Sequence, residues 1–173
     1  MVLDAITAFT KIHPVLEEYK YALQSLGIEP VRFPLKDRLL NRQNTAFARP
    51  DNVHRRRGKI AISSRDPLPR EALLHETAHI LLSHLLGDKR EHEMEAALVA
   101  HYAARRLGWN VEASSAAQYA KRYARHLQSS GETSGETGHE IVISAYAPDG
   151  ATQEKIRAAV EKIVSAFQNR QKS

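Results

Sequence analysis

The side chains of this sequence most able to do chemistry lie in one short stretch, His75-Glu76-Thr77-Ala78-His79. Two histidines four residues apart project from the same side of a helix, so both imidazoles can reach one cation. Glu76 lies about 100° further around such a helix, where it can contact a metal-bound water without binding the metal. Zinc lowers the pKa of such a water towards about 7, and a glutamate there can take its proton as hydroxide attacks a carbonyl. The stretch predicts a hydrolytic zinc site, in preference to two ordinary exposed histidines.

A hydrolytic zinc site needs a third protein ligand as well as an open position. A third histidine six residues after His79, as in the metzincin arrangement, is excluded because that position is Leu85. His84 would lie about 180° around a continuing helix from His75, and we expect it to point away. The third ligand is therefore expected to be a carboxylate on the following helix.

Three glutamates at the start of that helix are candidates for the third ligand: Glu91, Glu93 and Glu95. Periodicity does not separate Glu91 from Glu95, which lie one turn apart on the same side. Most such helix carboxylates are solvated, so two of the three are expected to face water. Because the chain has no Cys, a metal must be held by His, Asp or Glu, and no disulfide can form.

The elements that must position these side chains can be predicted from the surrounding pattern. Residues 45–48 are short and apolar, Pro50-Asp51-Asn52 is turn material, and Lys59–Ser63 alternates as a strand does. They predict a hairpin just before the motif. A helix is then expected from about Pro69 to Leu86, ended by Gly87. Its buried side would carry Leu73, Leu74, Ala78, Leu81, Leu82 and Leu85.

Further helices are expected on both sides of this unit. They cover residues 3–26, 89–107, 114–128 and 151–168. Pro14 is expected to divide or restart the first of them, and Gly27 to stop it. The last is amphipathic, and its expected inward residues are Ile156, Val160, Ile163, Val164 and Phe167. Loops are expected at residues 28–43 (with one short helical turn) and 131–138, whereas residues 140–146 have strand character without excluding a helix.

Length and composition fit one globular domain. The chain has 173 residues, of which 42% are hydrophobic and 26% charged, as is ordinary for a globular protein with a real core. No apolar run reaches the roughly 18 residues that a transmembrane helix needs, and residues 1–4 lack the basic start of a secretory signal. We expect a cytoplasmic protein with no membrane partner, and the absence of Cys fits a reducing compartment.

The net charge of +5 is partly concentrated in the run His54–Lys59. A basic cluster can meet phosphate or an acidic protein surface. The run is short and has no interleaved aromatic residue, so it is a weak signal for nucleic acid. We interpret it as the solvated tip of the hairpin.

Three segments together resemble ImmA/IrrE-type metallopeptidases. They are the strand Lys59–Ile62, the helix Leu74–Leu82 with its H-E-T-A-H sequence, and the helix Glu93–Ala100 with its E-A-A-L-V-A sequence. The chain looks most like the branch that contains the metallopeptidase domain of ArdC-type antirestriction proteins. The resemblance covers about residues 45–125, and Thr77 departs from it because the family usually has a bulky apolar residue there.

The resemblance implies an α+β fold, a mostly helical, gluzincin-like zincin domain with a small antiparallel sheet beside the H-E-x-x-H helix. It implies one zinc ion, with Glu95 as the third ligand after His75 and His79. It also implies that a substrate peptide adds as an extra strand at the edge formed by residues 60–63. The residues contacting that peptide would be Ile60, Ala61 and Ile62.

The same resemblance places a group that stabilises the oxyanion near the helix expected at residues 114–128. Tyr119 is the first choice for this role because ArdC-like family members have Tyr residues in that region. The other candidates are His101, Tyr102, Tyr123, His126 and His139.

The sequence as a whole predicts one domain over residues 1–173. Its parts are a helical extension at 1–43, a zincin core at 44–128, and a polar loop with a C-terminal helix at 129–173. The predicted function is a zinc-dependent endopeptidase that cleaves a protein or peptide of unknown identity, with Glu76 activating the water. The alternative is a metal-binding regulatory or antirestriction module of a mobile element, without peptide turnover. DNA binding is not expected to carry over, because no separate stretch is long enough for the DNA-binding domain of ArdC-type proteins.

Overall fold

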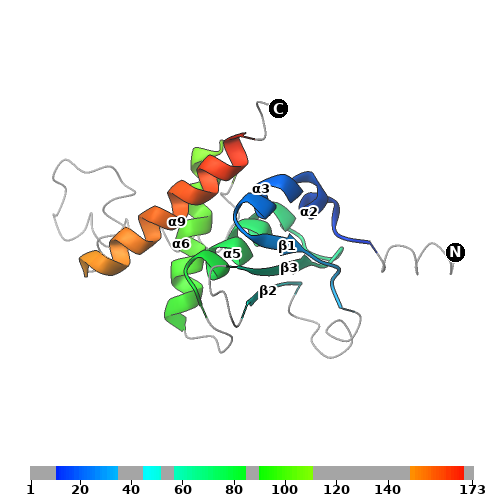
Figure 1. The fold of residues 1–173 in the computed structure, drawn as a ribbon, viewed down its shortest axis with the longest axis horizontal. Coiled ribbons are helices and arrows are strands. Elements are labelled where there is room, and N and C mark those ends of the chain that lie inside the picture. The colour runs from blue at the N-terminus through cyan, green and yellow to red at the C-terminus, as the bar shows by residue number, and fades with distance from the viewer. Residues whose placement is uncertain (1–10, 35–44, 52–56, 85–89, 111–148, 170–173) are drawn as a thin grey trace, which may run out of the picture.

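A computed structural model describes residues 11–34, 45–51, 57–84, 90–110 and 149–169 of the chain (Figure 1). Within these residues the fold is mixed α+β, with a small sheet and mostly helical surroundings. The helices are α2 (Pro14–Glu18), α3 (Lys20–Ser25), α5 (Pro69–Leu81), α6 (Arg90–Arg106) and α9 (Gly150–Gln168). The strands are β1 (Ile28–Pro30), β2 (Ala46–Pro50) and β3 (Gly58–Ile62).

The sheet has the strand order β1-β3-β2, so β3 is its central strand. β2 and β3 pair antiparallel, with Ala46 opposite Ile62, which confirms the predicted hairpin. β1 pairs parallel to β3, with Ile28 opposite Gly58. The sheet is therefore mixed, and the expectation of an antiparallel sheet was wrong. Residues 28–30 were expected to form a loop, but a proline is tolerated at the edge of a sheet and Ile28 is buried in the core.

One glycine sets how closely the sheet meets α5. A Cβ added at Gly58 would lie 2.6 Å from the carbonyl oxygen of Arg49 on β2 and 2.9 Å from Cδ1 of Ile80 on α5. One of these atoms belongs to the backbone and cannot move aside easily. Only glycine therefore allows β3 to approach both neighbours at this point.

α2 begins and α3 ends where Pro14 and Gly27 indicate in the sequence, although the break between the two helices at Tyr19 was not expected. Pro14 occupies the start of α2, where its missing N–H costs nothing, and Nδ1 of His13 accepts a hydrogen bond from the Val15 N–H at 3.1 Å. After α3 the chain passes through Gly27 at φ 76°, a left-handed conformation that favours glycine. The predicted helix start at Pro14 and the predicted helix stop at Gly27 are both confirmed.

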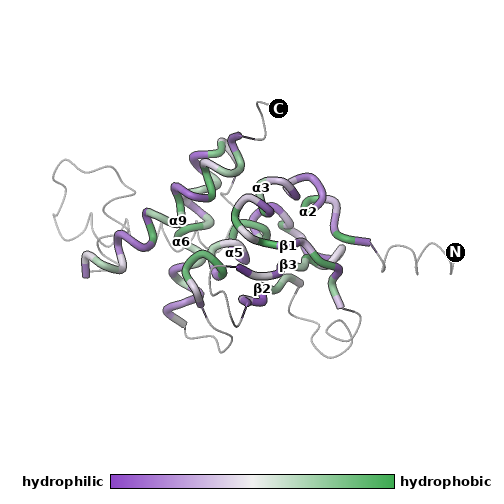
Figure 2. Tube along the Cα trace, viewed as in Figure 1, coloured by the Kyte–Doolittle hydropathy of each residue, from purple (hydrophilic) through white to green (hydrophobic). Residues whose placement is uncertain are grey.

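The core lies between α5, α6, α9 and the N-terminal helices. Figure 1 shows α9 crossing α6, and the tube in Figure 2 alternates between hydrophobic and hydrophilic along α9. All five residues of α9 predicted to face inward are buried. Three aromatic rings join the N-terminal helices to the ends of α6 and α9. The centroid of the Tyr19 ring lies 5.3 Å from that of Trp109 and 5.0 Å from that of Phe167.

The helix that carries the motif ends earlier than expected, at Leu81 rather than at Leu86. Ser83 has φ 57°, and the N–H groups of Ser83 and His84 bond back to the carbonyls of Ile80 and His79, each at 3.0 Å. This is a Schellman turn, which usually has glycine at the left-handed position. A serine there gives no stop signal in the sequence, so the pattern predicted a longer helix.

Several predicted features lie outside the described residues. They are residues 3–10, Gly87, the helix at 114–128, the loop at 131–138, the segment at 140–146 and residues 54–56 of the basic run. Within the described part of the chain, no helix is both long and apolar enough to cross a membrane.

Candidate metal centre

Two helices bring three potential metal ligands to one point. α5 supplies His75 and His79, and α6 packs along α5 and supplies Glu93. Nε2 of His75 lies 3.0 Å from Oε2 of Glu93 and 3.1 Å from Nε2 of His79. Nε2 of His79 lies 3.2 Å from the other carboxylate oxygen of Glu93, Oε1. One ligand atom from each residue falls within 4.8 Å of the others. We call these three residues the triad.

The carboxylate of the triad is not the one that the sequence favoured. Glu95 was expected to be the third ligand, but its Oε2 lies 2.9 Å from Nε2 of His84. Glu93 and Glu95 project about 200° apart around α6, so both cannot face the same side. Glu93 faces His75 and His79, and Glu91 is exposed at the start of the helix.

His84 is the second correction. It was expected to point away from the motif, but its Nδ1 lies 2.9 Å from Nδ1 of His79. The expectation assumed a continuing helix, whereas the turn at Ser83 reverses the chain and returns His84 to α5. The His84 ring also stacks on His92 of α6, with centroids 4.2 Å apart. The sequence signal was weak, because the left-handed residue is a serine.

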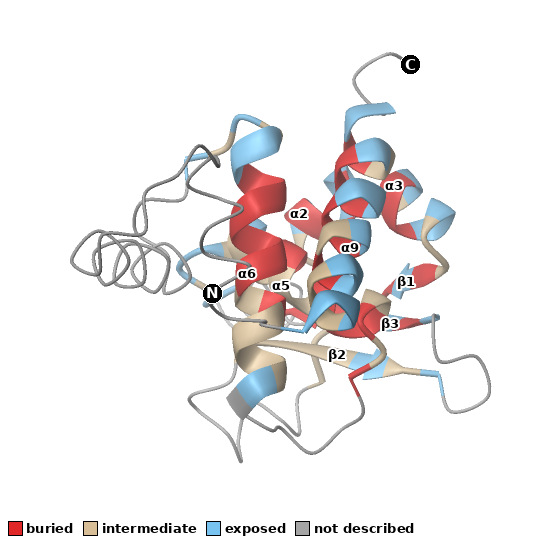
Figure 3. Ribbon diagram, turned by 90° about the vertical axis from the view of Figure 1, so that its left-hand side faces the viewer, coloured by how far each residue is buried: buried red, intermediate tan, exposed pale blue. Residues whose placement is uncertain are grey.

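The triad together with His84 and Glu95, which we call the cluster, extends from the solvent-exposed surface into the core. The exposed fraction of the side chain is 45% for Glu93, 27% for His75 and 11% for His79. It falls to 4% for His84, with 14% for Glu95. Figure 3 shows the same gradient along α6, which is exposed and half-buried near its N-terminal end and buried further along. Solvent therefore reaches the triad from the side of Glu93 and His75.

Hydrogen bonding and burial set the charges of these groups. The hydrogen bond with His75 is the largest effect that holds the pKa of the Glu93 carboxyl well below its usual range. The hydrogen bond with His84 lowers the pKa of Glu95. Burial lowers the pKa of His84, and this outweighs the opposite effect of Glu95. Both carboxyls are consequently ionised at neutral pH, and His84 is neutral.

The two residues that follow His75 in the motif differ in burial. Glu76 is half-buried and follows His75 directly on α5. Thr77 is fully buried, and its hydroxyl donates to the carbonyl of Leu73 at 2.7 Å. The helix backbone thus satisfies the hydroxyl, which explains how Thr fits where a bulky apolar residue was expected.

The predicted substrate strand is not at an edge of the sheet. Ile60, Ala61 and Ile62 belong to β3, which is paired with β1 on one side and β2 on the other. All three are buried. Because β3 is the central strand of the described sheet, the expectation of an edge at residues 60–63 was wrong. In the described part of the chain β2 is paired on one side only, and α5 packs against it.

Only two of the candidates for stabilising an oxyanion, His101 and Tyr102, belong to the described residues. Tyr119, Tyr123, His126 and His139 lie outside the described residues. Tyr102 and His101 of α6 are buried in the core, which does not favour either as a group that meets a substrate.

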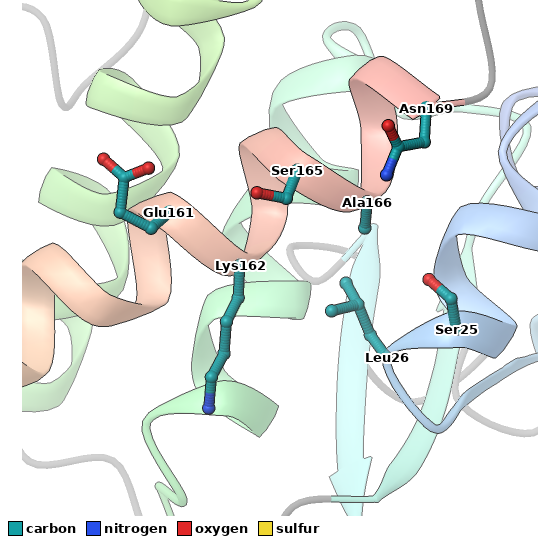
Figure 4. A pocket seen from close by; sticks show the side chains of 7 residues that line it. All are labelled: Ser25, Leu26, Glu161, Lys162, Ser165, Ala166 and Asn169. Atoms are coloured by element: carbon teal, nitrogen blue, oxygen red, sulfur yellow. The ribbon is translucent and has the colours of Figure 1, made fainter. Parts of the chain in front are cut away.

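A separate hollow lies between the end of α3 and α9 (Figure 4). Its volume is about 380 Å³, and its lining includes Leu26, Lys162 and Asn169. No residue of the triad lines it. The chemistry therefore points to the triad rather than to this hollow.

Searches among family models, curated proteins and solved structures find no match to the chain. The resemblance to ImmA/IrrE-type metallopeptidases therefore stays a prediction from the motifs. What stands on the structure itself is that the His-His-Glu triad could hold a metal ion.

Proposed function

We propose that the triad holds one zinc ion and that the chain is a zinc-dependent endopeptidase with a gluzincin-like fold. The observation that carries the proposal is the convergence of His75, His79 and Glu93, with one ligand atom of each within 4.8 Å of the others. Two imidazoles and one carboxylate are the protein ligands of several hydrolytic zinc sites, which keep a fourth position for water or substrate. When bound, zinc would lower the pKa of that water and polarise the scissile carbonyl.

The same donor set also suits non-haem iron, so the choice of metal needs a second observation. That observation is Glu76, which follows His75 on the motif helix and has no role in an iron triad. In an H-E-x-x-H helix the glutamate takes the proton of the attacking water and passes it to the leaving amine. Its half-buried position, with access to solvent, fits that task.

The decrease in side-chain exposure from Glu93 to His79 leaves one side of the triad open, which supports a substrate as large as a peptide. Glu93 and His75 form the open side of the triad, while His79 is nearly buried behind them. An extended peptide can add to the exposed edge of a sheet through its main chain. Within the described sheet β3 is the central strand, and β2 is the edge strand that packs against α5. We therefore place the substrate strand at Ala46–Pro50 instead of at β3.

The test is Glu76→Gln, which keeps the size of the side chain and removes the base. The zinc-loaded protein is assayed against a mixed fluorogenic peptide library and denatured casein, and zinc is quantified in the same samples. We expect zinc to be retained and hydrolysis to fall by roughly 100-fold or more. Glu91→Gln is the matched control, because it removes the same charge from an exposed site on α6 and is expected to change neither quantity.

Equal hydrolysis by the Glu76→Gln variant and the wild type would contradict this mechanism. If both bind zinc and neither cleaves any peptide, the metal-binding interaction module becomes the better account.

A further inference from the structure

We propose that His84 and Glu95 are positioning residues for this metal centre. A chain of hydrogen bonds runs from Glu95 through His84 to His79. It fixes the tautomer of His79 in which Nε2 has no proton and directs its lone pair towards the other two residues of the triad. The inference rests on the proposed metal site and adds to it the groups that orient its most buried ligand.

The chain of bonds can be followed from its carboxylate end. Oε2 of Glu95 lies 2.9 Å from Nε2 of His84. An ionised carboxylate can only accept a hydrogen bond, so Nε2 of His84 must carry the proton. A neutral imidazole has one N–H, and Nδ1 of His84 is therefore a bare acceptor.

The next hydrogen bond determines which nitrogen of the metal ligand His79 carries the proton. Nδ1 of His84 lies 2.9 Å from Nδ1 of His79. Because the first nitrogen is an acceptor, the second must be the donor, and Nε2 of His79 is left without a proton. That nitrogen lies 3.2 Å from Oε1 of Glu93. A lone pair and a carboxylate at this distance repel each other unless a cation lies between them, so the tautomer suits a metal and not a proton.

The surroundings of His84 favour one fixed arrangement. Its side chain is 4% exposed, and its ring is nearly parallel to that of His92, with an interplanar angle of 8°. Burial keeps water from competing for the hydrogen bonds of this ring. The left-handed turn at Ser83 holds the backbone so that the ring reaches His79.

This arrangement extends a common feature of metal sites. A ligating histidine usually donates its other ring N–H to a carboxylate or a carbonyl, and this raises the basicity of the ligand. Here a second histidine stands between the ligand and the carboxylate. His84 and Glu95 therefore act through His79 and do not themselves touch metal or substrate.

The first test reads the tautomers directly in the wild-type protein. Long-range ¹H–¹⁵N NMR of the histidine rings, with and without zinc, distinguishes a protonated Nδ1 from a protonated Nε2. We expect Nδ1–H on His79 and Nε2–H on His84 in both samples. Nε2–H on His79 in the zinc-free protein, or Nδ1–H on His84 in either sample, would overturn the inference.

The second test separates hydrogen bonding from packing. His84→Phe keeps a ring to stack on His92 but has no acceptor, whereas His84→Gln offers a carbonyl oxygen to His79. Zinc affinity is measured by competition with a chelator, and the melting temperature of each zinc-free variant is measured separately. We expect His84→Phe to weaken zinc binding roughly 10- to 100-fold and His84→Gln to recover part of that loss.

The outcomes distinguish this inference from the proposed function. If His84→Phe binds zinc as tightly as the wild type, the positioning role is wrong and the triad stands. If the two variants lose affinity equally and in proportion to their melting temperatures, the role of His84 is only structural and the inference is again wrong. A wild-type protein that binds no zinc overturns both proposals.

Discussion

Glu93 and Glu95 lie two residues apart on α6, and each carboxylate meets a histidine of another segment, yet the two pairs differ in their access to solvent. In the open pair, Glu93 is 45% and His75 is 27% exposed. In the closed pair, Glu95 is 14% and His84 is 4% exposed. His79 lies between the pairs and contacts both through its two ring nitrogens.

The difference shows how the same residue types can have two tasks. A group that binds metal and meets a substrate needs a side open to water, which the Glu93–His75 pair has. A group that orients a ligand works best where water cannot compete, because hydrogen bonds are stronger in a medium of low dielectric constant. We therefore assign metal binding to the open pair and positioning to the closed pair.

The largest effect is expected for His79→Ala, because this residue belongs to both halves of the cluster. The variant loses one of three metal ligands and leaves the closed pair without its contact to the triad. We expect zinc affinity to fall by on the order of 100-fold or more, measured by isothermal titration calorimetry. Retention of wild-type affinity would rule out the triad as the metal site.

The matched pair Glu93→Gln and Glu95→Gln compares the two halves directly. Each variant removes one carboxylate charge from α6 with almost no change in size. We expect Glu93→Gln to weaken zinc binding more, because it alters a ligand, and Glu95→Gln to weaken it only roughly 10- to 100-fold. Chelator competition on both proteins gives the order of the two effects. The reverse order would restore Glu95 as the ligand, as the family resemblance implied.

A smaller effect is expected at the turn that brings His84 to the triad. Ser83→Gly removes the strain of a left-handed non-glycine residue and should stabilise the protein by about 1 kcal/mol in urea denaturation. Gly108→Ala is the matched reverse test, since Gly108 has φ 74° in the same kind of turn after α6, and an added Cβ there meets nothing within 4 Å. It should destabilise by about 1 kcal/mol. Destabilisation by Ser83→Gly would contradict the assigned turn at Ser83.

The smallest effect is expected far from the cluster, at the start of α9. Oδ1 of Asp149 accepts the Thr152 N–H at 2.8 Å, and hydrogen bonds with Thr152 lower the pKa of Asp149 from its ordinary value. A lowered pKa in the folded state gives stability that is present above about pH 4 and lost as the pH falls below it. Asp149→Asn keeps the helix cap without the charge.

For zinc-free protein, the melting-temperature advantage of the wild type over Asp149→Asn should shrink as the pH falls from 5 to about 2. An advantage that grows over this range would contradict the assigned cap.

Features that depend on neighbouring residues were predictable from the sequence. The period of apolar residues placed His75 and His79 on one side of a helix and gave the inward face of α9. The alternation at β3 and the turn before it gave the hairpin. In each case the signal lies within one segment, so no knowledge of packing was needed.

Features that depend on packing between segments were not predictable. The rotation of α6 about its axis decides whether Glu93 or Glu95 faces α5, and the helical period allows either. The position of His84 depends on a left-handed serine, which most helix ends replace with glycine. β1 is three residues long and contains Pro30, and its parallel partner is distant in sequence.

The most direct test of the central claim is the location of zinc in crystals of the zinc-loaded protein, from anomalous diffraction at the zinc absorption edge. We predict one peak, with Nε2 of His75 and Nε2 of His79 at about 2.0–2.1 Å and a carboxylate oxygen of Glu93 at about 2.0–2.2 Å. A peak bonded to Glu95 or His84, or no peak between α5 and α6, would contradict the claim.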